Sequence, residues 1–229
     1  MNKRSAVSLL STLLLLVVVG AAGVVVGRQW GTSATTSTTT TTTAPVAQPA
    51  TAIWPFASTS TRFSDPLMAA QTFAIDYLGF TSPVIGAFQQ GDSRSGEVAV
   101  RASASAVATT ILVRQLTSSN SWWVLGAVSP NIEVTSPSAL MKVSSPVKLK
   151  GRSTAFEAVV NVEVRQDGSL NPLAHSTVMG GSMGAMGPYA GQMNFPAPSA
   201  SSGAIVFRTL SAKDGHVVDA SVLRVSFAH

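Results

Sequence analysis

Residues 160–165 are Val-Asn-Val-Glu-Val-Arg, so a valine stands at every second position. Side chains of a β-strand point alternately to opposite faces, and this period of two puts the valines on one face and the polar side chains on the other. Residues 223–227, Leu-Arg-Val-Ser-Phe, repeat the pattern. Both stretches therefore predict half-buried strands of an antiparallel sheet.

Further short strands are predicted around these two, punctuated by the turn dipeptides Asp167-Gly168 and Asp214-Gly215. The predicted strands are 132–135, 147–152, 158–165, 173–178, 189–195, 204–210 and 221–227. About seven short antiparallel strands in roughly 100 residues is typical of an immunoglobulin-like β-sandwich, which we place at residues 129–229. The chain has no cysteine, so this sandwich must be held by its apolar core alone.

Residues 62–128 predict a small α+β domain. Ser64-Asp65-Pro66 is a helix start, with a capping side chain before a proline at the first helical position, and Gly79 is placed to end the helix. Strands are predicted at 84–88, 97–102, 109–116 and 122–128. One helix on a four-stranded antiparallel sheet would hide both apolar faces.

The N-terminus predicts a membrane segment. Residues 6–27 carry no charge and are mostly Ala, Val and Leu, and a helix of that length spans about 33 Å, enough for a bilayer core. Lys3 and Arg4 precede the segment, which favours a single-pass anchor over residues 1–28 in the cell membrane, with the N-terminus cytoplasmic and the bulk extracytoplasmic. The alternative is a signal peptide cleaved near Gly20-Ala21-Ala22 and a secreted product.

Residues 29–61 predict a disordered stalk, because they are rich in Thr and Pro, include six consecutive threonines and show no apolar period. Charged residues make up only 11% of the whole chain, against about 25% in ordinary soluble domains. This argues against a typical cytosolic enzyme or a coiled coil. Nucleic acid is not expected as a partner despite a net charge of +5, because basic runs and aromatic-glycine RNA-binding signatures are absent.

A family resemblance rests on several stretches of the second segment. They are Ile132-Glu133-Val134-Thr135-Ser136-Pro137, Val143-Ser144-Ser145-Pro146-Val147, Gly151 with Phe156-Glu157-Ala158, the Gly180-Gly181 loop ending in Gly187-Pro188-Tyr189, and Ser211-Ala212-Lys213-Asp214-Gly215. In order and spacing, residues from about 131 to 228 resemble the immunoglobulin-like domain of bacterial spore germination proteins.

The resemblance implies a non-catalytic, extracytoplasmic module without catalytic, metal or cofactor-binding residues. Residues 62–128 do not resemble the germination-specific domain that often accompanies this module, so a role in sporulation or germination does not follow directly. The combination of anchor, Thr-rich stalk and module resembles an actinobacterial envelope protein.

Two groups of residues are candidates for contacts with a partner. Lys148, Lys150 and Arg152 alternate with apolar residues and share one face of a strand, which suits an anionic polymer or lipid headgroups, or simply a solvated sheet face. Met179, Met183, Met186 and Met193 lie in a Gly-rich stretch, and such a loop suits an adaptable contact surface or a plain strand connection. The candidate contact residues in it are Met183, Met186 and Tyr189.

The adjacent Trp122 and Trp123 would place one ring on each face of a strand, one in the core and the other in a contact or, preferably, in the joint between domains.

One catalytic motif is present. Gly180-Gly181-Ser182-Met183-Gly184 matches the G-x-S-x-G nucleophile elbow, with Asp214, His216 and His229 following in order. The elbow needs a helix after the serine, and Ala185-Met186-Gly187-Pro188 does not suit one, so a loop is favoured over a hydrolase.

We therefore expect no enzyme activity and no cofactor. The sequence favours a membrane-anchored binding or structural module that contacts an envelope protein or a wall polymer. The alternative function is a carrier or sensor with a small-ligand pocket between Phe73, Tyr77, Trp122 and Trp123. A deep pocket between helix and sheet would support that alternative, and a filled core would remove it.

Overall fold

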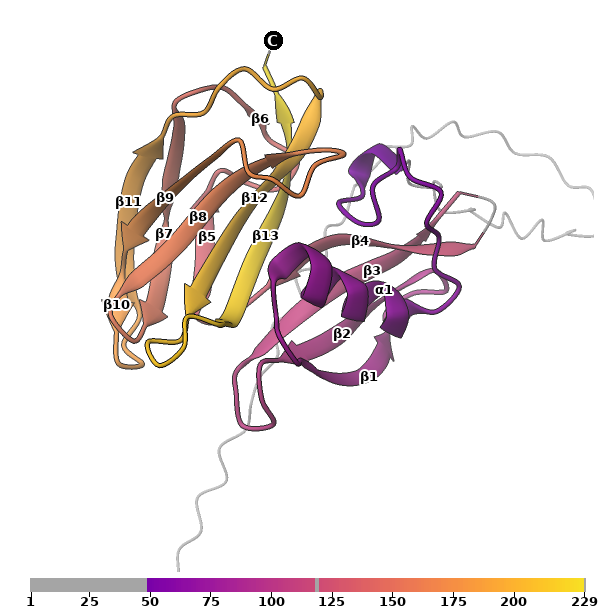
Figure 1. Cartoon of the computed structure of the whole chain (residues 1–229), viewed down its shortest axis with the longest axis horizontal. Coiled ribbons are helices and arrows are strands. Elements are labelled where there is room, and N and C mark those ends of the chain that lie inside the picture. The colour runs from indigo at the N-terminus through magenta and orange to yellow at the C-terminus, as the bar shows by residue number, and fades with distance from the viewer. Residues whose placement is uncertain (1–48, 118–119, 229) are drawn as a thin grey trace, which may run out of the picture. The chain divides into compact units, whose positions relative to one another are not determined.

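The computed structural model describes residues 49–117 and 120–228, all within one compact unit (Figure 1). The expected anchor over residues 1–28 and most of the expected stalk lie outside this part of the chain. Within it, no helix is both long enough and apolar enough to cross a membrane. The expected domain boundary near residue 128 stays a prediction.

The helix of the first segment begins and ends at the predicted residues. The Asp65 side chain accepts a hydrogen bond from the Leu67 backbone N–H at 2.8 Å, and Pro66 occupies the first helical position. Helix α1 (Pro66–Thr72) continues into the π-helix η2 (Phe73–Leu78). Gly79 then ends it at φ 87°, in the left-handed region that glycine adopts without steric cost.

The four strands predicted after the helix are present, but they do not form a separate sheet. They are β1 (Val84–Gln90), β2 (Ser95–Arg101), β3 (Ala108–Leu116) and β4 (Ser121–Val128), each antiparallel to the next. Ala127 of β4 pairs with Val222 of the last strand, so the sheet continues into the second segment. This pairing joins two strand edges that would otherwise leave backbone N–H and C=O groups unpaired.

The second segment is a β-sandwich that contains all seven predicted strands and two short additional ones. Its strands are β5 (Ile132–Ser136), β6 (Lys142–Val143), β7 (Val147–Ala155), β8 (Val159–Gln166), β9 (Ala174–Met179), β10 (Gly181–Ser182), β11 (Gly187–Met193), β12 (Ser202–Leu210) and β13 (Val217–Phe227). One sheet has the order β1-β2-β3-β4-β13-β12-β8-β9, with β6 beside β13. In the other sheet β7 pairs with β5, β10 and β11. The two missed strands have two residues each, too few to show an alternating pattern.

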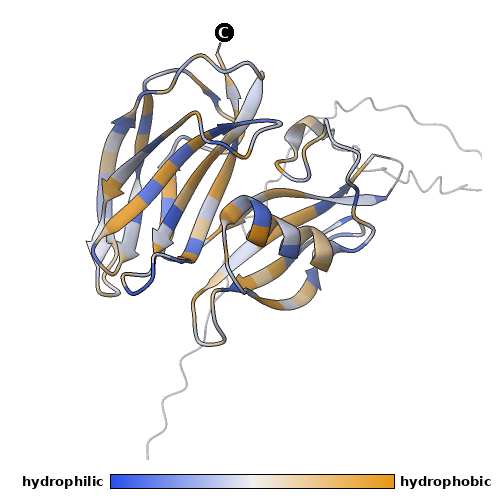
Figure 2. Cartoon of the chain, in the orientation of Figure 1, coloured by the Kyte–Doolittle hydropathy of each residue, from blue (hydrophilic) through white to orange (hydrophobic). Residues whose placement is uncertain are grey.

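Strands β8 and β12 show two different patterns of burial. Hydrophobic and hydrophilic residues alternate along β8 (Figure 2), and its valines at 160, 162 and 164 are buried as predicted. The polar face was expected to be wet, but Arg165 on it is only 6% exposed because it is covered by η2. In β12, Ile205 and Phe207 lie in the sandwich core, whereas Ala204 and Val206 lie in a second core together with Phe73 of η2. Because both faces of β12 are covered, its apolar run shows no alternation.

Residues 50–56 belong to the folded unit, which corrects the expectation of a stalk as far as residue 61. The Ile53 backbone N–H donates to the Val124 carbonyl at 2.8 Å, and the Val124 N–H donates to the Trp54 carbonyl at 2.7 Å. Ile53 is only 2% exposed. We call residues 50–56 the N-terminal strap. The strap packs on β4 because burial removes its apolar side chains from water, which lowers the free energy relative to a hydrated stalk.

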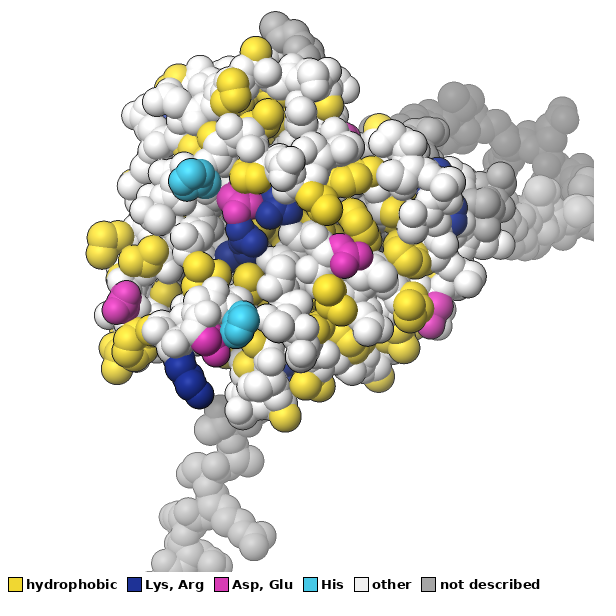
Figure 3. Space-filling view, in the orientation of Figure 1, with side chains coloured by type: hydrophobic (Ala, Val, Ile, Leu, Met, Phe, Trp, Pro, Cys, Tyr) yellow, Lys and Arg dark blue, Asp and Glu magenta, His cyan; other side chains and the backbone are white. Residues whose placement is uncertain are grey.

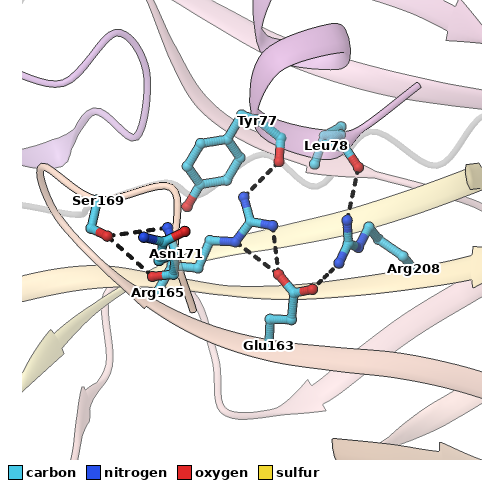
Figure 4. Close-up of polar contacts among 7 residues, drawn as sticks. All are labelled: Tyr77, Leu78, Glu163, Arg165, Ser169, Asn171 and Arg208. Carbon is cyan, nitrogen blue, oxygen red and sulfur yellow. Dashed lines mark hydrogen bonds and ion pairs between the residues drawn. The ribbon is translucent and has the colours of Figure 1, made fainter. Parts of the chain in front are cut away.

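A buried ion cluster ties η2 to β8 and β12 (Figure 4). The Glu163 carboxylate accepts from Arg165 Nε at 2.8 Å and Nη2 at 2.5 Å, and it also accepts from Arg208 Nη2. Arg165 Nη1 donates to the Tyr77 carbonyl at 2.6 Å, and Arg208 Nη1 donates to the Leu78 carbonyl at 3.0 Å. The final carbonyls of a helix lack partners within it, and the two arginines supply them here.

Candidate functional site: the loop-end groove

Three connections of the sandwich meet at one end, together with a turn from the first segment. They are the β7–β8, β10–β11 and β12–β13 connections and the β2–β3 turn. They surround an open groove of about 780 Å³, here called the loop-end groove, whose lining includes Val107, Phe156, Met183, Leu210, Thr154 and Asp219. Ligand sites in proteins commonly measure about 300–1,000 Å³, and immunoglobulin variable domains bind through loops at one end of the sandwich.

Large hydrophobic side chains around the groove are exposed to solvent. Phe156 is 62% exposed and Met183 is 78% exposed, while Val107 and Leu210 are each more than a third exposed. In the view of Figure 3, exposed hydrophobic side chains are present at this end of the sandwich as well as elsewhere on the face. Contiguous exposed apolar surface of this kind marks interaction sites in soluble proteins.

The Met-rich stretch brings one methionine to the groove. Met183 stands at the tip of the β10–β11 turn with φ 53°, and Met186 is held by its carbonyl, which accepts from Arg152 Nη2 at 3.1 Å. Met179 is exposed on β9, but Met193 is buried in the sandwich core. The four methionines therefore do not form one surface, because Met193 faces inward on β11.

The floor of the groove contains buried polar groups that the sequence analysis missed. The fully buried Asp219 accepts from Thr209 Oγ1 at 2.5 Å and from Asn131 Nδ2 at 2.7 Å. Thr154 is 7% exposed, and its hydroxyl has no hydrogen-bond partner among the described residues. The sequence signal for this group was an aspartate within the mostly apolar residues 217–225, because a carboxylate is rarely fully buried unless it is paired.

The predicted geometry of Lys148, Lys150 and Arg152 is confirmed, and we call these three residues the β7 cation stripe. All three are exposed, whereas Val147 and Leu149 between them are buried in the sandwich core. Lys142 is close to the end of the stripe, because it lines a hollow of about 240 Å³ together with Lys148. The role of the stripe remains a prediction.

Residues 131–216 match a known family. Its description is the immunoglobulin-like domain of bacterial spore germination. The comparisons with curated proteins and with solved structures gave no match. The match starts at Asn131 in the groove floor and ends at His216 in the β12–β13 connection. All three sandwich connections around the groove, and the β7 cation stripe, thus belong to the matched spore germination domain.

The geometry around Ser182 does not support the hydrolase alternative. Ser182 ends the two-residue strand β10, and a tight turn into β11 follows instead of the helix that a nucleophile elbow needs. Asp214 accepts from the backbone N–H of His216 at 3.2 Å, while the His216 ring is within 2.9 Å of Thr81 Oγ1, so Asp214 does not orient the imidazole. His229 lies outside the described residues. An immunoglobulin-like spore germination domain suggests a non-catalytic module.

The prediction that Tyr189 is a contact residue is wrong. It is 3% exposed, its ring packs near Phe207 in the sandwich core, and its hydroxyl donates to the Glu133 carbonyl at 3.1 Å. Burial raises the pKa of this phenol above its ordinary value. Tyr189 therefore stabilises the sandwich from within.

The two tryptophans are buried, and the residues expected to line a ligand pocket pack as core. Trp122 is 9% exposed and packs in the core between helix and sheet. Trp123 is 2% exposed and packs with Ala52 of the N-terminal strap, so the joint expected between domains is wrong for this residue. Phe73 stacks on Tyr77 with ring centroids 5.0 Å apart, and both are buried. These side chains pack against one another as core, so the structure gives no support to the carrier or sensor alternative.

Proposed function

We propose that this chain is a non-catalytic binding module of the bacterial cell envelope, which holds a protein partner in the loop-end groove. The observation that carries the proposal is the groove itself, with exposed Phe156 and Met183 above a floor of buried polar groups. Apolar side chains at the centre with polar groups placed to fix orientation are the composition of protein interfaces and binding sites. The non-catalytic character suggested by the matched family agrees with this role.

The proposal places the module outside the cytoplasm on a single-pass anchor at residues 6–27. The support is the length and apolar composition of that segment and the basic residues before it. A mass measurement of the mature protein tests the anchor. The full-length mass is expected, whereas a product that begins near Gly23 would establish the cleaved, secreted alternative.

Site-specific crosslinking in intact cells tests the groove. A photoreactive amino acid at position 156 is expected to capture a defined protein, while the same probe at position 68 is expected to capture none. Met68 is a matched control because it is 47% exposed but lies on α1. The captured protein, once purified, should bind the wild-type chain and lose affinity for the Phe156→Ser, Met183→Ser variant.

The crosslinking result can also contradict the proposal. Both substituted side chains are exposed, so the double variant should keep its stability within about 0.5 kcal/mol. Equal capture at positions 156 and 68, or unchanged affinity of the double variant, would refute the groove as the contact site.

A link to spore germination is a further part of the proposal, and it rests on the description of the matched family. The identity of the protein captured at position 156 tests this link. A component of the germination or sporulation machinery would support it, and a partner devoted to wall synthesis or secretion would place the module elsewhere in the envelope.

A further inference from the structure

We propose that the β7 cation stripe, extended by Lys142, binds an extended anionic polymer along the outer face of the sandwich. This second surface is separate from the protein-binding groove proposed above. It is carried by three observations: cations without ion pairs, their linear arrangement, and hollows beside them.

The four cations lack the salt bridges that four arginines in the described part of the chain form. Arg114, Arg165, Arg208 and Arg224 each form a salt bridge to a carboxylate. In the described part of the chain, no salt bridge is formed by Lys142, Lys148, Lys150 or Arg152, which have no carboxylate within 4.0 Å. Glu133 lies opposite Arg152 in the β5–β7 register and is the acidic residue of this face. The face therefore carries an excess of positive charge that an anion can neutralise.

The arrangement of these cations is linear. Residues two apart in a strand are separated by about 6.6–6.8 Å, so the charges of the stripe repeat over about 13 Å along β7. Lys148 and Lys150 line a hollow of about 510 Å³ whose other side is formed by Ala190, Gly191 and Gln192 of β11. A second hollow lies between Lys142 and Lys148. Cations in a row with open space beside them suit a chain with repeating negative charges.

The neighbouring side chains favour a polymer over a membrane or a nucleic acid. The exposed residues beside the stripe are small or polar: Glu133, Thr135, Pro188, Ala190 and Gln192. Insertion into a membrane interface uses apolar side chains next to the cations, and the exposed Leu140 and Met141 adjoin only Lys142. Single-stranded nucleic acids are bound by aromatic stacking, and none of these residues is aromatic.

A matched pair of variants tests the proposal with the full chain in neutral-detergent micelles. Lys148→Gln with Lys150→Gln removes two charges from the stripe, and Arg101→Gln with Lys213→Gln removes two charges elsewhere. The probe is fluorescently labelled inorganic polyphosphate, with neutral dextran and anionic phospholipid vesicles as separate ligands. Arg152 is left unchanged because it also holds the Met186 carbonyl.

The wild-type chain and the Arg101, Lys213 variant should bind polyphosphate with the same salt dependence. Each contacted charge contributes about 0.7 to the slope of log K against log salt for a single-stranded polyanion. Loss of two contacts should therefore reduce the slope by about 1.4 and weaken binding about 25-fold at about 0.1 M salt. Equal loss of polyphosphate affinity in both variants would show that only the net charge of the chain matters. Binding to vesicles without binding to polyphosphate would assign the surface to lipid. Either result, or no binding of polyphosphate, overturns the proposal.

Discussion

Replacing Glu163 by Gln tests the ion cluster that ties η2 to β8 and β12. The substitution keeps the shape of the side chain but removes the negative charge that Arg165 and Arg208 share. The side chains of Glu163, Arg165 and Arg208 are 13%, 7% and 16% exposed, so the two guanidinium groups would stay buried without a counter-ion. Breaking a buried ion pair by removing one partner costs about 3–5 kcal/mol, a large share of a typical stability of about 5–15 kcal/mol.

Denaturant unfolding followed by tryptophan fluorescence measures this loss. Asp92→Asn is the matched control, because the Asp92–Arg114 pair at 3.1 Å lies on the surface with side chains 52% and 22% exposed. A surface pair of this kind contributes about 0–1 kcal/mol. If Glu163→Gln costs no more than Asp92→Asn, the cluster does not hold the two parts together and the reasoning is refuted.

Alkaline pH, the N-terminal strap and one glycine offer further tests. Burial raises the pKa of Tyr77 and Tyr189, the two tyrosines of the chain. The native state thus keeps phenol protons that the unfolded chain loses above about pH 10, and stability should fall there by about 1.4 kcal/mol per pH unit for each tyrosine. An ultraviolet titration that shows native tyrosines ionising near pH 10 would contradict this, and Tyr189→Phe should halve the loss. Ile53→Ala should cost about 2–5 kcal/mol in denaturant unfolding, whereas a disordered stalk would lose nothing. Gly151→Ala would place a Cβ atom 2.0 Å from the Glu133 carbonyl oxygen, so its melting temperature should drop by an amount equivalent to about 1–3 kcal/mol; an unchanged melting temperature would show that this approach is not tight.

The strands were predictable wherever one face of a strand is wet, because alternation then appears in the sequence. The β7 cation stripe is the clearest case, because its buried and exposed positions agree with the prediction. In residues 160–165 the valines are buried as predicted, but Arg165 on the polar face is buried as well. Alternation is absent from residues 204–207. This absence indicates a strand covered on both faces, but it does not say that η2 provides the second cover.

The loop-end groove was not predictable because its members come from separate connections. Phe156 and Leu210 are 54 positions apart, and only the pairing of β7, β8, β12 and β13 brings them to one end of the sandwich. The N-terminal strap was missed for a different reason. Its Ile-Trp-Pro-Phe group, residues 53–56, follows a long Thr-rich stretch, and the composition of that stretch outweighed four apolar residues.

The contacts of the N-terminal strap are the ones that a force applied before Ala50 would load first. The Ala50 carbonyl accepts from Arg224 Nε at 3.0 Å and from Nη2 at 2.6 Å, and further along the strap Ile53 and Trp54 form hydrogen bonds with Val124. Any tension transmitted from residues before Ala50 reaches these contacts before it reaches a strand of either sheet. Detaching the strap would remove Ala52 from Trp123, so tryptophan fluorescence would report that detachment.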